Sequence, residues 1–174
     1  MALDLGPCAV FFGAEDSEAD LGKTQGGVKV TFSQAVADLL SDQYGTEPED
    51  QVITGHGAII TIPMASYTLA NWAIALHKEV KDLAGVDGIK GDSVVGTKLT
   101  TYANSLILKK YVDGSVSSDE EDWLRFPNAA PTGNPEVSFD GSTQRIITSE
   151  FRAFPDTNDV LYYIGSKDAA DGGS

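Results

Sequence analysis

Ala58-Ile59-Ile60-Thr61-Ile62 is the stretch that decides the fold class, because four of its five residues are β-branched and Pro63 ends the run. β-branched side chains restrict χ1 and pack well on a pleated surface, so this run is typical of a strand. Upstream, Val28-Lys29-Val30-Thr31-Phe32 alternates apolar and polar residues, which predicts a half-buried strand. These two segments indicate a β protein.

The rest of the chain is expected to follow the same pattern, with strands separated by glycine- and proline-rich turns. Asp113-Gly114 has the composition of a hairpin turn. Segment 35–40 is compatible with a strand or a short helical turn. The other predicted strands are 8–12, two within 94–112, 145–154 and 160–164. The predicted loops are 42–51, 85–92, 115–122 and 126–135, with an acidic flexible segment 13–27 and a flexible tail 168–174.

One helix is predicted, after Ser66 as N-cap and before Gly85. Its apolar residues recur at the spacing of one helical face, so this face is expected to pack on the sheet. The predicted core positions are Leu69, Trp72, Ala73 and Leu76, continued by Val80 and Leu83. We expect a single domain, 1–174, that is mainly β with one α-helix, because no change of composition marks a second domain.

The charge balance argues against a protein that grips nucleic acid. The chain has 26 acidic and 12 basic side chains, for a net charge of −14. Binding to phosphates requires clustered Lys and Arg, and the densest pair is Lys109-Lys110. Cys8 is the only cysteine, which fits a reducing compartment. We find no signal peptide and no apolar run long enough for a membrane helix, so we expect a cytoplasmic site of synthesis and no membrane partner.

No motif for chemistry is complete in this sequence. Gly22-Lys23-Thr24 resembles the end of a phosphate-binding loop, but Ser17 stands where the first glycine is required. His56 and His77 are the only histidines, so with Cys8 they fall short of the four ligands of a structural zinc site. Asp156-Thr157-Asn158-Asp159 begins like a calcium loop but lacks its later glycine and glutamate. We therefore expect a protein that is not an enzyme and has no catalytic, metal or cofactor site.

The order of several short motifs resembles the major tail tube proteins of long-tailed, siphovirus-like bacteriophages. Segment 21–28, LGKTQGGV, is similar to the sequence that precedes a strand in that family. Segment 42–48, DQYGTEP, is similar to a family loop, and 151–156, FRAFPD, is similar to a late family strand. The loop is the most specific of these motifs, and the resemblance extends over most of the chain.

The resemblance implies a β-sandwich or partial barrel with a flanking helix. It also implies homohexameric rings, stacked into a tube through which the genome leaves the capsid. The implied partners are further copies of the chain and the tape-measure, terminator and distal tail proteins, with DNA passing through the lumen without specific binding. The implied location is the virion tail, after assembly in the host cytoplasm. Two alternatives remain open: a β-sandwich module that binds carbohydrate or a host surface, and a related tail-terminator or connector protein.

The loop 42–51 is the predicted assembly site, because it is too long for a simple hairpin and contains no motif for catalysis. We expect it to contact the next ring, with Tyr44 as anchor and with Asp42, Gln43, Gly45 and Pro48 around it. The acidic excess further predicts a lumen of neutral or negative charge, along which DNA slides without being captured.

Overall fold

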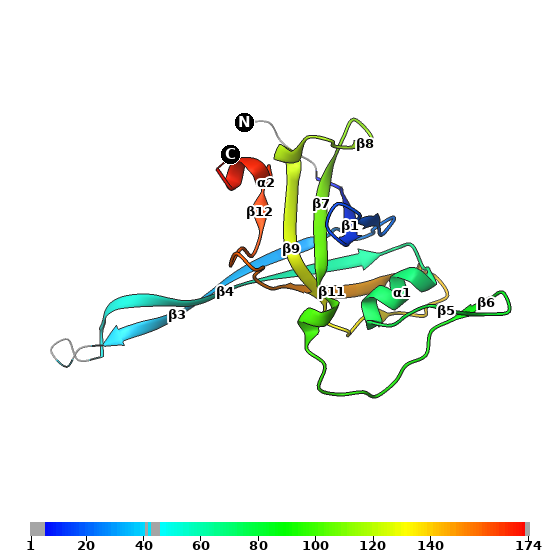
Figure 1. Ribbon diagram of the computed structural model, residues 1–174, viewed down its shortest axis with the longest axis horizontal. Helices are drawn as coiled ribbons and strands as arrows, with labels where there is room; N and C mark the ends of the chain where they lie inside the picture. The colour runs from blue at the N-terminus through cyan, green and yellow to red at the C-terminus, as the bar shows by residue number, and fades with distance from the viewer. Residues whose placement is uncertain (1–5, 41, 43–45, 173–174) are drawn as a thin grey trace.

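The computed structural model describes residues 6–40, 42 and 46–172. In this part of the chain, a large antiparallel sheet carries most of the structure, and its main path runs β2-β1-β7-β9-β11-β4-β3 (Figure 1). The short strands β8, β10 and β12 pair with β7, β11 and β9. The strands of this sheet are β1 (Cys8–Gly13), β2 (Ala19–Asp20), β3 (Lys29–Leu40), β4 (Pro48–Met64), β7 (Asn104–Val112), β8 (Ser115–Val116), β9 (Trp123–Pro131), β10 (Glu136–Val137), β11 (Ile147–Ala153) and β12 (Tyr163–Ile164).

The remaining elements lie around this sheet. A separate two-stranded ribbon is formed by β5 (Lys81–Leu83) and β6 (Val86–Gly88). The helical elements are α1 (Leu69–Leu76), η1 (Leu99–Tyr102), η2 (Glu120–Asp122) and α2 (Lys167–Ala170). The protein is therefore mainly β with one substantial helix, as the sequence predicts.

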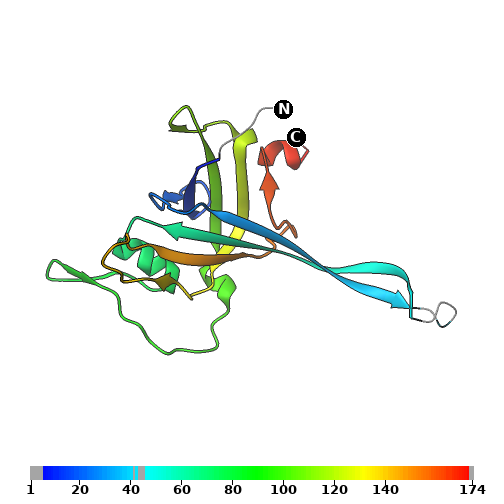
Figure 2. The ribbon, with the colours of Figure 1, turned by 180° about the vertical axis from the view of Figure 1, so that it is seen from behind.

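The sheet curls so that its two halves cross, with β1, β7 and β9 on one side and β11, β4 and β3 behind them (Figures 1 and 2). The core fills the space between the halves and is sealed at one side by α1. Its largest fully buried residues include Phe126 from one half and Ile60, Ile62 and Phe151 from the other. Because one continuous sheet supplies both layers, a partial barrel describes the fold better than a sandwich of two separate sheets.

Several strand predictions are confirmed. β1, β11 and the 58–62 part of β4 lie where the sequence places them. In 58–62 the alternation is strict, since Ala58, Ile60 and Ile62 are buried while Ile59 is exposed. The turn at Asp113-Gly114 joins β7 to β8, with both residues in the left-handed region at φ 50° and 80°.

The first part of the predicted loop 126–135 is wrong, because β9 runs through Pro127 to Pro131, while 132–135 connects β9 to β10 outside any strand or helix. The register explains how a proline is tolerated there. Asn104 pairs with Ala129 and Leu106 with Phe126, so two residues of β9, Pro127 and Asn128, oppose one residue of β7. This is a β-bulge, where a missing backbone N–H does not interrupt the ladder of hydrogen bonds.

Other elements also differ from the sequence prediction, and the predicted loops 85–92 and 115–122 contain the short strands β6 and β8. Segment 94–98 forms no strand, and β7 is the single strand of 94–112. The last strand is shorter than predicted, at Tyr163–Ile164. The acidic segment contains β2, and the predicted tail begins inside α2.

The helix is shorter than predicted and buries a different face. Thr68, not Ser66, is its N-cap, since its Oγ1 accepts a hydrogen bond from the Asn71 backbone N–H at 3.2 Å. The helix ends at Leu76 because His77 takes the left-handed conformation at φ 56°. Val80 and Leu83 therefore lie beyond it.

Of the predicted core positions on this helix, Ala73 is buried and Trp72 is half-buried against the core. Leu76 is also half-buried, whereas Leu69 is exposed, so the prediction for Leu69 is wrong. Asn71 takes a buried position instead. Its Nδ2 donates to the carbonyl oxygens of Leu21 and Ser66 at 3.0 and 2.8 Å. This side chain ties two loops to the helix.

Candidate functional site

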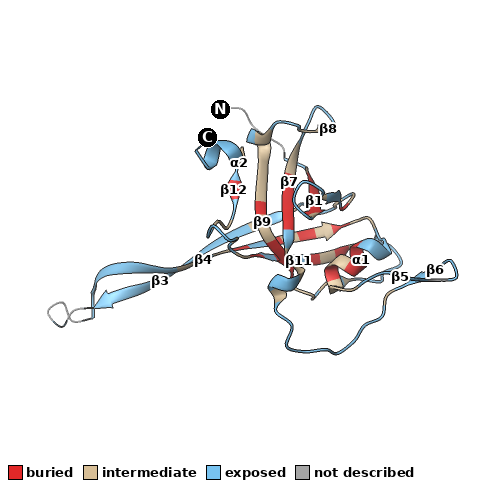
Figure 3. Cartoon of the chain, in the orientation of Figure 1, coloured by how far each residue is buried: buried red, intermediate tan, exposed pale blue. Residues whose placement is uncertain are grey.

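A long β-hairpin projects from the body, and we call its outer part, residues 34–40 paired with 48–56, the arm. β3 and β4 pair continuously from Lys29 with Thr61 to Leu40 with Pro48, with irregularities beside Ala35 and Leu39. The arm extends to one side of the molecule and no other element covers it (Figures 1 and 2). Its described residues are exposed except for Gly55, which is half-buried (Figure 3).

The arm is apolar on both faces. Val36 lies directly opposite Ile53, and their exposed fractions are 47% and 53%. Leu40, near the tip, is 63% exposed. Val52 and Leu39 belong to the other face of the ribbon and are also exposed. A monomer gains little from such side chains, because apolar surface stabilises a fold only when it is removed from water.

The base of the arm is anchored to the body by aromatic side chains. The ring of Phe32 lies 4.8 Å from that of Tyr162 and 6.4 Å from that of Phe126, measured between centroids. Phe32 pairs with Ala58, whose side chain is buried in the core. Residues 30 and 32 thus face the core, and the same face of the ribbon continues outward to Val36 and Ile53 after leaving the body.

The arm also carries a one-signed charge. No Lys or Arg occurs between residues 30 and 77, whereas the arm and its tip contain five carboxylates. One of them, Asp38, accepts a hydrogen bond at 2.7 Å from Gln51 Nε2 across the ribbon. The carboxylates are Asp38, Asp42, Glu47, Glu49 and Asp50.

The predicted assembly loop lies at the tip of this arm. Asp42 is exposed, and Pro48 begins β4 opposite Leu40. Gln43, Tyr44 and Gly45 lie outside the described residues. The prediction that 42–51 is all loop is wrong, since Pro48 to Gln51 belong to β4; a proline is compatible with the first position of a strand.

Sequence reasoning missed the arm, although a signal was present. The sequence is compatible with a strand or a helical turn in 35–40, although Val36 and Leu40 lie in step with the alternation that starts at Val28. Gln34 and Asp38 interrupt that alternation. Because 46–51 contains turn-forming residues, the sequence did not indicate that β4 begins there. A strand of 12 residues followed by one of 17 is longer than the usual strand, and this length is what carries the hairpin beyond the body.

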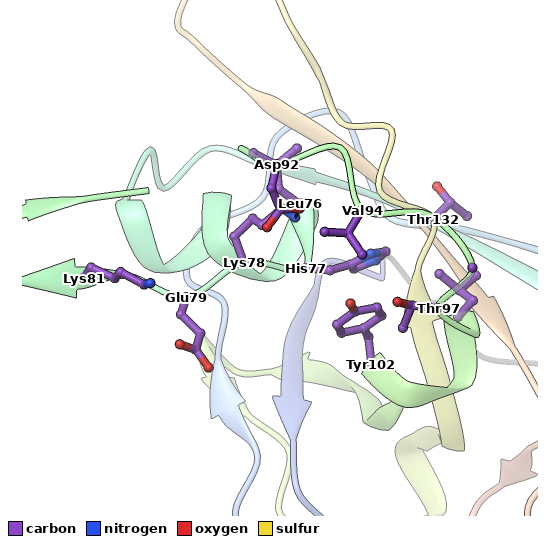
Figure 4. Close-up of a pocket in the computed structure, with 12 residues that line it drawn as sticks. Leu76, His77, Lys78, Glu79, Lys81, Asp92, Val94, Thr97, Tyr102 and Thr132 are labelled. Atoms are coloured by element: carbon purple, nitrogen blue, oxygen red, sulfur yellow. Dashed lines mark hydrogen bonds and ion pairs between the residues drawn. The ribbon is translucent and has the colours of Figure 1, made fainter. Parts of the chain in front are cut away.

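A second feature is a pocket of about 610 Å³ at the end of α1 (Figure 4). The His77 ring stacks on the Tyr102 ring, with centroids 4.5 Å apart and planes 10° apart. His77 Nε2 lies 2.5 Å from the Pro131 carbonyl oxygen, where a proton on Nε2 is donated to it. At Gly133, with φ 78°, an added Cβ would lie 3.1 Å from the His77 ring. The His77 side chain therefore packs between the end of α1, η1 and the end of β9.

The connection 89–98 closes one side of this pocket, and we call it the strap. Lys78 Nζ lies 2.6 Å from Asp92 Oδ1, which ties the strap to the end of α1 (Figure 4). This hydrogen bond from Lys78 lowers the pKa of the Asp92 carboxyl. Val94 and Val95 of the strap are 75% and 91% exposed.

The described residues contain no group of three or more His, Cys, Asp or Glu side chains placed to hold a metal ion. His56 lies on the exposed arm, whereas His77 follows α1 on the body. Cys8 is partly buried, and burial raises the pKa of its thiol. Among the helices that the structure describes, none has the length and apolar character needed to cross a membrane.

Neither known protein families nor curated proteins gave a match to this chain.

Proposed function

We propose that this protein is a structural subunit that assembles with copies of itself into rings, which stack into a tube of the bacteriophage tail type. The arm is the observation that carries this proposal. It is a two-stranded ribbon with apolar residues on both faces and no covering element within the described chain (Figure 3).

A ribbon of this kind favours self-assembly for two reasons. A two-stranded hairpin without further packing is marginally stable in water. The outer edge of β3, which ends the sheet, also presents unpaired backbone groups that template pairing with another chain. A neighbouring subunit that covers the arm and this edge removes both liabilities, and an identical neighbour allows a closed ring.

The sequence motifs and the charge support the tube form of this assembly. The tip of the arm carries the DQYGTEP segment that resembles the tail tube family loop, and we assign it the contact with the next ring. The net charge of −14 disfavours capture of DNA, as a conduit for an ejected genome requires. The proposed partners are other copies of the chain and the tape-measure, terminator and distal tail proteins, and the proposed location is the virion tail.

The candidate lumen surface is the outward face of β3, β4 and β11. Thr61 pairs with both Lys29 and Glu150, which puts one base and one acid in the same row. In the neighbouring row, Ile59 pairs with Thr31 and Arg152. These two rows hold two bases, Lys29 and Arg152, and one acid, Glu150, so they do not carry the acidic excess expected of the lumen. Charges close to the bore have more weight there than distant acids.

Negative-stain microscopy of the purified protein tests the proposal. Rings and stacked tubes are expected. Rings that never stack would favour a terminator or connector protein, and compact single particles would favour the binding module and contradict the proposal.

The role of the tip has its own test. Replacing residues 42–47 by Asn-Gly shortens the turn and keeps the paired strands, since Asn-Gly suits a two-residue hairpin. Rings are expected to persist while tubes are lost. Tubes of normal length from this variant would show that the tip does not join rings.

A further inference from the structure

Two groups of exposed apolar residues lie far apart on the molecule, and other exposed apolar residues, such as Phe139 and Ile164, belong to neither group. One is the arm, with Val36, Leu40, Val52 and Ile53. The other is segment 78–98, which we call the distal face and which contains the β5–β6 ribbon and the strap. Its exposed apolar residues are Val80, Val86, Val94 and Val95. The two surfaces lie on opposite sides of the body, so one molecule cannot join them (Figure 1).

We infer that the distal face of one subunit receives the arm of the next, in a head-to-tail contact between copies of this chain. This inference rests on the proposed function and names the surface that the arm requires. Two different surfaces that match each other make a heterologous interface, and a heterologous interface repeated around an axis closes a ring.

Charge decides between this contact and its simplest rival, in which two arms pair with each other. Each arm with its tip holds five carboxylates and no Lys or Arg, so paired arms would bring like charges together. The distal face holds four lysines and four carboxylates and is neutral, although the whole chain carries −14. Three of its lysines are exposed and form no ion pair among the described residues: Lys81, Lys90 and Lys98.

The distal face is also hollowed, as a surface that receives a ribbon should be. The pocket of about 610 Å³ under the strap is lined by Leu76, Val94 and Lys81 among others. A second hollow of about 570 Å³ is lined by Val86, Ile89, Lys81 and Lys90. Lys81 belongs to both, so the two hollows are adjacent. The first hollow has a mixed lining that includes Glu79 and Asp92, whereas the second is mainly apolar with two lysines. An apolar hollow with ammonium groups fits a ribbon that carries apolar side chains and carboxylates.

Carbodiimide cross-linking tests this contact, because the reagent joins a carboxylate directly to a lysine in contact with it. The assembled protein is prepared from a mixture of ¹⁴N- and ¹⁵N-labelled chains, so that mass spectrometry separates links between chains from links within one. Links are expected between Glu49 or Asp50 of one chain and Lys81, Lys90 or Lys98 of another. Links from the arm to other lysines only would overturn the inference. Because the arm has no lysine, this reagent could not join two arms that pair with each other.

Two variants that each remove one surface complete the test. Val36→Lys with Ile53→Glu removes apolar surface from the arm and places opposite charges across the strands, which keeps them paired. Val94→Asp with Val95→Asp changes the exposed strap and leaves the core intact. Each variant alone should be monomeric by light scattering. Their mixture should form dimers that do not grow, since one arm and one distal face remain intact.

Ile164→Asp is the matched control, because this side chain is 69% exposed and lies outside both surfaces. It should assemble as the wild type does. If the strap variant also forms rings, the distal face does not receive the arm, while the proposed function stands. If the wild type itself forms no rings and no links between chains, both proposals fail.

Discussion

The two halves of β4 each contain a β-branched segment, 52–54 and 59–62, and these segments have opposite environments. In the inner half, Ala58, Ile60, Ile62 and Met64 are at most 1% exposed. In the outer half, Val52 and Ile53 are about half exposed. Both halves pair with β3, but only the inner half also pairs with β11 on its other edge. The β1–β7–β9 layer lies over the inner half, and nothing in the described chain lies over the outer half.

This contrast teaches that the apolar pattern of a strand does not say which molecule will cover it. Burial of the inner half is completed within the chain, whereas we propose that a second copy covers the outer half. Substitutions in the inner half should therefore affect folding of the monomer, and substitutions in the arm should affect assembly. The predictions below test this division.

The largest effect is expected for Phe151→Ala, in the core strand β11. Phe151 is fully buried and its ring meets that of Phe12 edge to face, with centroids 5.2 Å apart. Loss of a buried phenylalanine should lower the free energy of unfolding by about 3–5 kcal/mol. Urea denaturation of the monomer measures this loss, and an unchanged midpoint would show that Phe151 is not part of the core.

A smaller effect on stability is expected for Val36→Thr with Ile53→Thr in the arm. Threonine keeps the β-branched shape, and the replaced methyl groups are exposed, so the monomer should lose less than about 1 kcal/mol. Assembly should nevertheless be weakened, with a higher protein concentration needed to form rings. A large loss of monomer stability, with assembly unchanged, would reverse the division between the two halves.

The smallest effect concerns the Lys78–Asp92 ion pair. Because Lys78 lowers the pKa of Asp92 in the folded chain, the pair stabilises the strap above the unfolded pKa of the carboxyl, about 3.9. That contribution is lost as the pH falls through the lower folded value. Asp92→Asn should remove it at every pH, and trypsin should then cleave after Lys90 faster at neutral pH.

The matched control for this measurement is Asp87→Asn, on the exposed β5–β6 ribbon outside the ion pair. It should leave cleavage after Lys90 unchanged. Equal cleavage of the Asp92→Asn variant and the wild type would show that the ion pair does not hold the strap.

The sequence predicts the core strands well, because the apolar alternation and the local composition both favour strands there. Ala58 to Ile62 and Cys8 to Phe12 are strands in both the prediction and the structure. The β-bulge at Pro127 could not be found in the same way, since it depends on the register with β7, a partner set by tertiary structure. The helix was extended too far because Val80 and Leu83 continue its apolar period, while the left-handed conformation of His77 ends it.

The candidate site was predicted only in part. The sequence pointed to segment 42–51 as an assembly element but described it as a loop, whereas in the structure Pro48 to Gln51 belong to a strand paired with β3. Asn71 was missed because a polar residue within an apolar helix carries no sign of the two carbonyl groups that it will meet. The distal face was missed as well, since Val86 and Val94 belong to glycine-containing segments without a regular apolar period.

Hydrogen exchange of the arm tests the central claim most directly, because it reports whether the outer half of the hairpin is completed by a neighbour. Amides of residues 34–40 should exchange rapidly in the monomer and become strongly protected in assembled rings, while those of 58–64 should be protected in both states. Fast exchange of 34–40 in the assembled protein would contradict the account, because the arm would then remain uncovered.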